Sequence, residues 1–224
     1  MNRRTAELGS LPLSDACYLC GSTTDLTRDH LPPKGFFPRP LPQNMITVAC
    51  CQTCNRSWQQ DDEAVRAFLS LAIDRSPAGD AIWEQRVIPG TVARSPRFRE
   101  SMLARVQNFA VATPFGIEVL PAFEPPQERL ERFMVRLTKG FLRFYYRDYD
   151  YGSSIFSVRH IPSTEQNLQM LEDGLIGTRY DERGDGVIRY RYGLSDTRLS
   201  GLWFYMFYDA VWFLVHHAQP TASA

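Results

Sequence analysis

Two Cys-x-x-Cys pairs, Cys17 with Cys20 and Cys51 with Cys54, constrain this chain more than any other feature. Four thiolates suit tetrahedral Zn²⁺, and two such pairs are typical of a structural zinc site. A site of this kind stabilises a short segment that cannot bury a core of its own. The two-residue spacing selects Cys51 over the adjacent Cys50, which we expect to be a small buried apolar residue.

The composition changes near residue 60. All five cysteines precede that point, and most of the aromatic residues follow it. This change predicts a metal-stabilised module in residues 1–60 and a larger domain in residues 61–224. Lys+Arg and Asp+Glu are both 25, and a net charge of zero excludes a histone-like polycation but not a local basic face.

The hydropathy pattern favours a cytoplasmic protein with no membrane segment. Residues 1–13 contain no apolar run of signal-peptide length. Residues 201–218 are strongly apolar, but Asp209 divides them, and a charge at that depth is costly in lipid. Their aromatic and β-branched residues favour two buried strands instead.

Helical spacing of apolar residues predicts four helices in the second part of the chain. Asp61 or Asp62 is suited to cap the first, and Ser95-Pro96 is a typical start for the second. Ser163 with Gln166 resembles a capping box for the fourth. The first helix is expected to begin at residues 61–62. The other three are expected over residues 95–110, 127–147 and 163–174.

The chain becomes strand-like after these helices. Gly184-Asp185-Gly186 separates two short runs, 177–181 and 187–192, and predicts a hairpin. With the two strands of 201–218, these runs predict a small antiparallel sheet. The expected fold class is therefore α+β, with a zinc module followed by a domain of helices and antiparallel strands.

The residues between and after the cysteine pairs carry a motif. Asp29-His30 is followed by Pro33 in an Asp-His-x-x-Pro pattern, Asn44 comes next, and Asn55 directly follows the last cysteine. This order resembles the HNH, or ββα-metal, endonucleases with a Cys₄ zinc site, over about residues 15–63. It also looks like a group of bacterial HNH proteins, some of which act in defence against foreign DNA, including antiphage defence.

The same residues suit phosphodiester hydrolysis. The carboxylate of Asp29 and the amide oxygen of Asn55 are hard ligands that suit Mg²⁺ or Mn²⁺. His30, with an ordinary pKa of about 6.5, can accept a proton from water as a general base. The resemblance implies that Asn44 fixes the histidine ring. Two basic residues are candidate phosphate contacts, Lys34 and Arg56.

The predicted helix over residues 127–147 carries a basic stripe at spacings of three and four residues. Like charges at this spacing repel each other unless something neutralises them. We hypothesise that the stripe follows a nucleic-acid backbone. Pairing with acids elsewhere in the chain is the alternative. The stripe consists of Arg129, Arg132, Arg136, Lys139, Arg143 and Arg147.

These features predict a metal-dependent HNH endonuclease that cuts DNA. In this interpretation Zn²⁺ is structural and Mg²⁺ or Mn²⁺ is catalytic. The alternative is a non-catalytic zinc-stabilised module that binds nucleic acid or protein. A third hypothesis is an effector that stays inactive until an activating or regulatory protein partner arrives.

Overall fold

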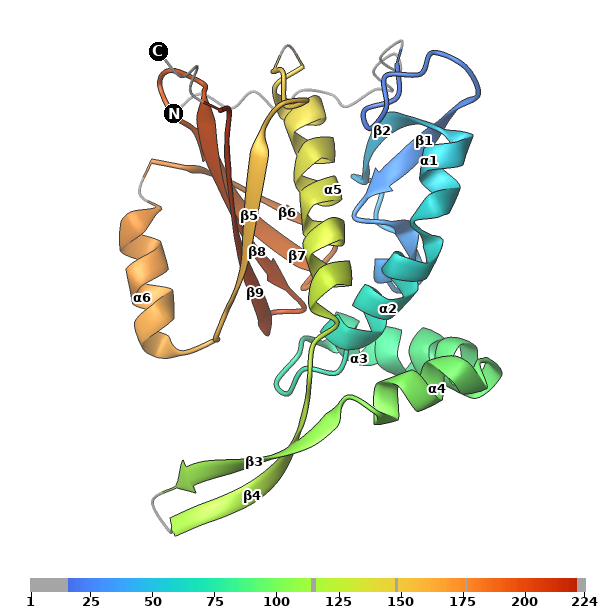
Figure 1. The fold of residues 1–224 in the computed structure, drawn as a ribbon, viewed down its shortest axis with the longest axis vertical. Helices are drawn as coiled ribbons and strands as arrows, with labels where there is room; N and C mark the ends of the chain where they lie inside the picture. The colour runs from blue at the N-terminus through green and yellow to red at the C-terminus, as the bar shows by residue number, and fades with distance from the viewer. Residues whose placement is uncertain (1–15, 114–115, 148, 176, 221–224) are drawn as a thin grey trace.

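The computed structural model describes residues 16–113, 116–147, 149–175 and 177–220. It contains both helices and antiparallel strands, so the predicted mixture of α and β structure is confirmed. Figure 1 shows the cysteine-bearing module on one side of the long helix α5 (Gln127–Tyr145) and a five-stranded sheet on the other.

The N-terminal module is a strand pair followed by helices. Strands β1 (Leu26–Leu31) and β2 (Ile46–Cys51) are antiparallel, and a short 3₁₀ turn, η1 (Lys34–Phe36), lies in the connection between them. Helix α1 (Gln52–Ser57) starts directly after β2. Helix α2 (Gln59–Leu69) follows after one residue and packs against α5. The module therefore runs in the order strand, strand, helix, helix.

A second helical group links the module to α5. It consists of α3 (Pro77–Ile82), the π-helical segment η2 (Trp83–Val92) and α4 (Pro96–Leu103). The strands β3 (Val106–Thr113) and β4 (Gly116–Phe123) then form an antiparallel pair that projects away from the rest of the molecule in Figure 1.

The C-terminal sheet is antiparallel, in the order β5-β9-β8-β7-β6. It contains the predicted hairpin and the two strands that replace the candidate membrane segment. In the described part of the chain, no helix is both long and apolar enough to cross a membrane. The strands are β5 (Ile155–Ile161), β6 (Arg179–Arg183), β7 (Ile188–Leu194), β8 (Ser200–Phe207) and β9 (Val211–Ala218).

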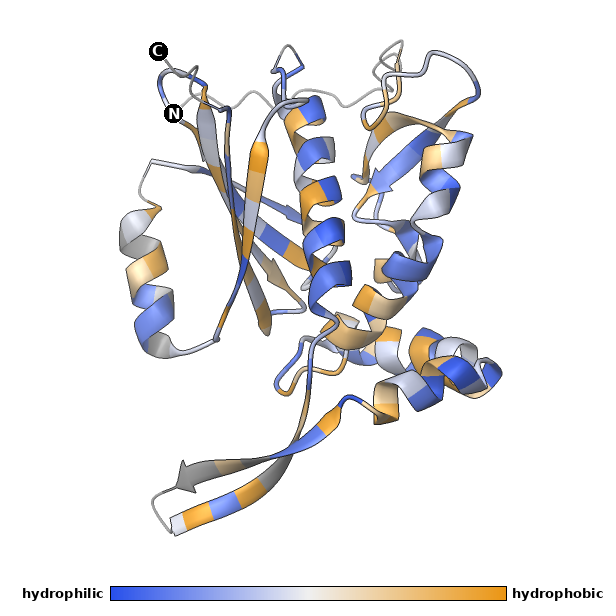
Figure 2. Cartoon of the chain, viewed as in Figure 1, coloured by the Kyte–Doolittle hydropathy of each residue, from blue (hydrophilic) through white to orange (hydrophobic). Residues whose placement is uncertain are grey.

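Aromatic residues join α5 to one face of this sheet. Phe141 of α5 stacks on Tyr190 of β7, with ring centroids 4.6 Å apart. Figure 2 shows hydrophobic and hydrophilic residues interspersed along α5, as expected for a helix that buries one face. The opposite face of the sheet carries Phe204, which packs with Leu171 of α6 (Glu165–Gly174). One cluster of buried side chains connects the module, α5 and the sheet.

Three local predictions need correction, although the predicted cap at Ser95 is confirmed by its bond from the Phe98 N–H. The predicted helix over residues 95–110 ends at Leu103, because the following residues pair with β4. Helix α6 is capped by Thr164 and not by the preceding serine. Asp61 and Asp62 are not caps either: they lie in the first turn of α2 and pair with arginines of α5.

Candidate metal centre

The four predicted cysteine ligands come together at one end of the strand pair. Cys17 and Cys20 precede β1, Cys51 ends β2, and Cys54 lies in the first turn of α1. Their sulfur atoms all lie within 4.8 Å of one another, and those of Cys20 and Cys51 are 3.7 Å apart. With zinc–sulfur bonds of about 2.3 Å, tetrahedral zinc holds its sulfurs roughly 3.8 Å apart. The four thiols therefore fit a zinc ion.

Cys50 is not one of the four clustered thiols, as the spacing predicts, although its Sγ lies 3.9 Å from Cys17 Sγ. Cys50 is fully buried in the core, and burial raises the pKa of its thiol. Burial also acts to raise the pKa of Cys17, but surrounding backbone hydrogen bonds outweigh it and lower that pKa to about 6. A thiol that ionises easily is suited to be a metal ligand.

Asp29 occupies a buried position on β1. It is 5% exposed, and its Oδ2 accepts a hydrogen bond of 2.8 Å from the Tyr18 hydroxyl. Burial raises the pKa of Asp29, while the nearby guanidinium of Arg136 acts in the opposite direction. The predicted metal ligand thus faces the interior between β1 and α5, in an environment that already supplies one proton donor and one positive charge.

His30 lies next to Asp29 and faces the other side of the strand, because neighbouring side chains alternate along β structure. It is half-buried and stands opposite Thr47 of β2. Burial, followed by the positive charges of Lys34 and Arg28, lowers the pKa of His30 to about 4. The imidazole is therefore neutral at physiological pH and keeps a free lone pair, and its lowered pKa makes it a weaker base than an ordinary histidine.

The two predicted asparagines have different placements. The Asn55 side chain donates a hydrogen bond of 3.1 Å to the hydroxyl of Thr27. Thr27 and Asp29 are two residues apart on β1 and share a face, so Asn55 approaches the side of the strand that carries Asp29. Asn44 lies exposed in the turn before β2, and no hydrogen bond joins it to His30 within the described ranges.

The basic stripe on α5 is largely occupied by contacts within the protein. Arg136 is 2% exposed, and its Nη2 lies 2.6 Å from Asp62 Oδ1. The nucleic-acid role predicted for Arg136 is therefore wrong, because a buried guanidinium cannot reach a phosphate backbone. Arg132 makes two bonds to Asp61, at 2.9 and 3.0 Å, and Arg129 Nη1 lies 3.8 Å from the same carboxylate.

The remaining basic candidates are less constrained. Lys139 lies with its Nζ 5.4 Å from the centre of the Phe156 ring, and Arg143 donates to a backbone carbonyl one turn along. Lys34 and Arg56 are exposed on the module. These four side chains can meet a ligand without breaking an ion pair within the described part of the chain.

No family model, curated protein or solved structure matches this chain. The site is therefore interpreted from its own residues. Sequence reasoning missed two of them, Tyr18 and Thr47, which contact Asp29 and stand opposite His30 respectively. Neither carries a local signal, because each acquires its partner only through the pairing and folding of distant segments.

Proposed function

We propose that this protein is a metal-dependent endonuclease that hydrolyses phosphodiester bonds in DNA. One observation carries the proposal: β1, β2 and α1 follow one another around a Cys₄ cluster, with Asp29 and His30 on β1 and Asn55 turned toward that strand. This arrangement supports the resemblance to ββα-metal nucleases that the sequence motif suggests.

In this proposal the cysteine cluster is structural. Four thiolates fill the coordination sphere of zinc and leave no position for a substrate. The zinc would fix the loop before β1 against the start of α1. It would thereby hold Asn55 close to β1, because Asn55 follows the last ligand, Cys54, directly.

Asp29 and Asn55 are the residues that would hold a catalytic Mg²⁺ or Mn²⁺. Both approach one face of β1, and their carboxylate and amide oxygens are the ligand types these ions prefer. The bond from Asn55 Nδ2 to Thr27 uses the nitrogen of that amide and leaves its oxygen, Oδ1, as the atom that would meet the ion. The bound ion would neutralise charge on a substrate phosphate.

His30 is the proposed general base. Its neutral imidazole can take a proton from the attacking water, and its ring is only half-buried. Lys34 and Arg56 are exposed on the same module and can contact substrate phosphates. Asn44 remains a proposed orienting residue that would have to approach His30 when substrate is bound.

The test is a cleavage assay with supercoiled plasmid and single-stranded DNA, in Mg²⁺, in Mn²⁺ and without divalent ions. We expect metal-dependent cutting by wild type, loss of cutting in His30→Ala and full activity in His216→Ala. His216 is an exposed histidine on β9, so it controls for the loss of an imidazole. Zinc content is measured for every sample. Equal activity in wild type and His30→Ala would contradict the proposal.

One observation favours the alternative of a non-catalytic binding module. Asp29 is 5% exposed and already bonded to Tyr18, an arrangement that also suits a purely structural carboxylate. This alternative predicts that folded, zinc-loaded protein binds DNA or a protein partner without cutting, and that His30→Ala changes nothing. The cleavage assay combined with a DNA-retention assay separates the two functions.

A further inference from the structure

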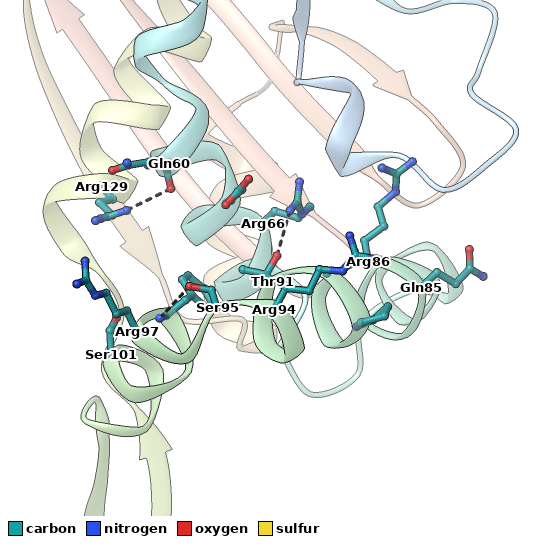
Figure 3. Close-up of a pocket in the computed structure, with 14 residues that line it drawn as sticks. Gln60, Arg66, Gln85, Arg86, Thr91, Arg94, Ser95, Arg97, Ser101 and Arg129 are labelled. Atoms are coloured by element: carbon teal, nitrogen blue, oxygen red, sulfur yellow. Dashed lines mark hydrogen bonds between the residues drawn. The ribbon is translucent and has the colours of Figure 1, made fainter.

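A large basic pocket lies away from the proposed nuclease residues. Its volume is about 870 Å³, and its walls come from α2, η2 and the first turns of α4. Figure 3 shows arginine side chains from these elements gathered around the pocket, with Arg129 of α5 at one edge. This volume lies within the range of cavities that hold small molecules and cofactors, roughly 300–1,000 Å³.

The charge of the pocket is strongly one-sided. Its lining contains five arginines and only one acidic residue, Glu63. Four of those arginines form no ion pair with any described residue, whereas Arg129 shares Asp61 with Arg132. Unpaired like charges around one cavity create a field that attracts anions. The four are Arg66, Arg86, Arg94 and Arg97.

Arg66 is the most constrained of the four. One guanidinium nitrogen lies 3.4 Å from the Thr91 hydroxyl, and the buried Nε has no hydrogen-bond partner within the described part of the chain. A Cβ atom on Gly35 would lie only 2.5 Å from Arg66 Nη1, so the glycine leaves room for this guanidinium. Glu63 acts on this guanidinium electrostatically but forms no ion pair with it among the described residues, and a bound anion would offset the cost of its burial.

The other lining groups suit a ligand that carries polar groups and a ring in addition to phosphate. The side chains of Gln60, Gln85 and Ser101 offer neutral hydrogen-bonding groups, and Phe98 and Pro89 offer apolar surface. Guanidinium groups match phosphate oxygens with two parallel bonds, and a half-buried aromatic ring can contact a planar base. Together these groups match a molecule that carries several phosphates and one ring system.

We propose that this pocket binds the phosphate groups of a nucleotide. The nucleotide can be free, as a di- or triphosphate, or it can be the phosphorylated end of a strand. In either form its phosphates contact Arg66, Arg86, Arg94 and Arg97. This assignment does not rest on the nuclease proposal, because none of the pocket residues belongs to the group around His30 and the cysteines.

The test is calorimetric titration of the full, zinc-loaded chain with ATP, AMP, inorganic triphosphate and a 5′-phosphorylated single-stranded pentanucleotide. We expect triphosphate-bearing ligands to bind more tightly than AMP, and affinity to fall as salt rises. Arg94→Glu should weaken binding at least about tenfold, since it removes one charge-assisted contact and adds repulsion. Arg94 is exposed and unpaired among the described residues, so its replacement spares the fold.

The matched control is Arg99→Glu, which makes the same charge change on α4 at an exposed residue outside the pocket lining. It should bind as wild type does. Tight binding of the pentanucleotide alone, weakened by Arg94→Glu but not by Arg99→Glu, supports the pocket with a strand as the source of phosphate. Absence of binding to all four ligands overturns the proposal, as does equal weakening by the two glutamate variants.

Discussion

The two sides of α5 join the rest of the molecule by different means. Toward the sheet, α5 presents Phe141, which stacks on Tyr190 and lies 6.0 Å from the Trp203 ring. Toward the N-terminal module, it also stacks Phe133 on Phe36, with ring centroids 5.1 Å apart. On this side it adds arginines, and Arg136 and Arg132 pair with Asp62 and Asp61 of α2. Figure 1 shows the helix standing between these two partners.

The two sides of α5 differ in how much of their stability comes from apolar burial. Aromatic burial is favourable in itself, at about 25 cal/mol per Å² of apolar surface removed from water. Buried charge pairs return little net free energy because both ions lose their hydration. The charge pairs therefore add little to the apolar contacts of the module side, and the cysteine cluster is suited to stabilise that side further.

The largest expected effect is loss of zinc from the module. Cys54→Ser removes one of four ligands, and structural zinc contributes about 10–16 kcal/mol in small zinc-binding peptides. We expect the variant to lose zinc and to lose amide protection in β1, β2 and α1, while the five-stranded sheet keeps its protection. Metal analysis and hydrogen exchange measure the two effects.

Cys50→Ala is the control for this comparison, because Cys50 is buried beside the cluster but is not one of its four members. It should retain one zinc per chain. Loss of protection in the sheet to the same extent as in the module would contradict the proposed difference. It would mean that the aromatic side depends on the metal as well.

The next effect tests the charge pairs directly. Arg136→Met leaves Asp62 and the buried Asp29 without their positive neighbour, and breaking a buried pair typically costs about 3–5 kcal/mol. Arg132→Met removes a half-exposed partner of Asp61 and should cost about 1 kcal/mol or less. Urea unfolding of both variants measures the difference. Equal costs would show that burial of Arg136 does not distinguish the two pairs.

The sequence predicts the helix and the cysteine ligands better than it predicts which distant residues contact them. Helix α5 was expected over residues 127–147 and spans Gln127–Tyr145, because its apolar period is a local property. The cysteine ligands follow in the same way from their spacing. The ion-pair partner of Arg136 could not be predicted, because Asp62 lies 74 residues away in the sequence and comes near only in the folded chain.

The same limit applies to the candidate site and the basic pocket. The adjacency of Asp29 and His30 on one strand follows from the motif, but the burial of Asp29 depends on α5 packing over it. The pocket collects arginines from three helical segments, and no single stretch of sequence shows a cluster. The pair β3 and β4 was missed because the apolar spacing of the preceding helix continues into it.

A pH-dependent effect is expected on the sheet side. His217 is fully buried, and burial, followed by His216, lowers its pKa to about 4. The unfolded chain has the ordinary histidine pKa of about 6.5, so the unfolded state binds the proton more readily. The free energy of unfolding should therefore fall as pH drops from about 6.5 to about 4, by about 3 kcal/mol in total.

Urea unfolding of wild type, His217→Gln and His216→Gln at several pH values measures this effect. The pH dependence between 4 and 6.5 should become shallower in His217→Gln, whatever the cost of that change at neutral pH. His216→Gln is the control, because His216 is exposed on the same strand. An unchanged slope in His217→Gln would assign the acid sensitivity to another histidine with a lowered pKa, such as His30.

The smallest expected effect concerns the end of α5 that has no acidic partner among the described residues. Arg143 is half-buried, and its Nη1 donates a hydrogen bond of 2.9 Å to the Arg147 carbonyl. Arg143→Glu should change the free energy of unfolding by less than about 0.5–1 kcal/mol. It should also lower the slope of log affinity for DNA against log salt by about 1, the loss of one phosphate contact.

Arg159→Glu provides the matched control, because it makes the same charge change at an exposed residue of β5, outside α5. A shift in Arg143→Glu alone assigns a DNA contact to the free end of α5. An equal shift in both variants would reflect only the overall charge of the protein. No shift in either variant would mean that Arg143 makes no phosphate contact, and it would remove this end of α5 from the proposed DNA-binding surface.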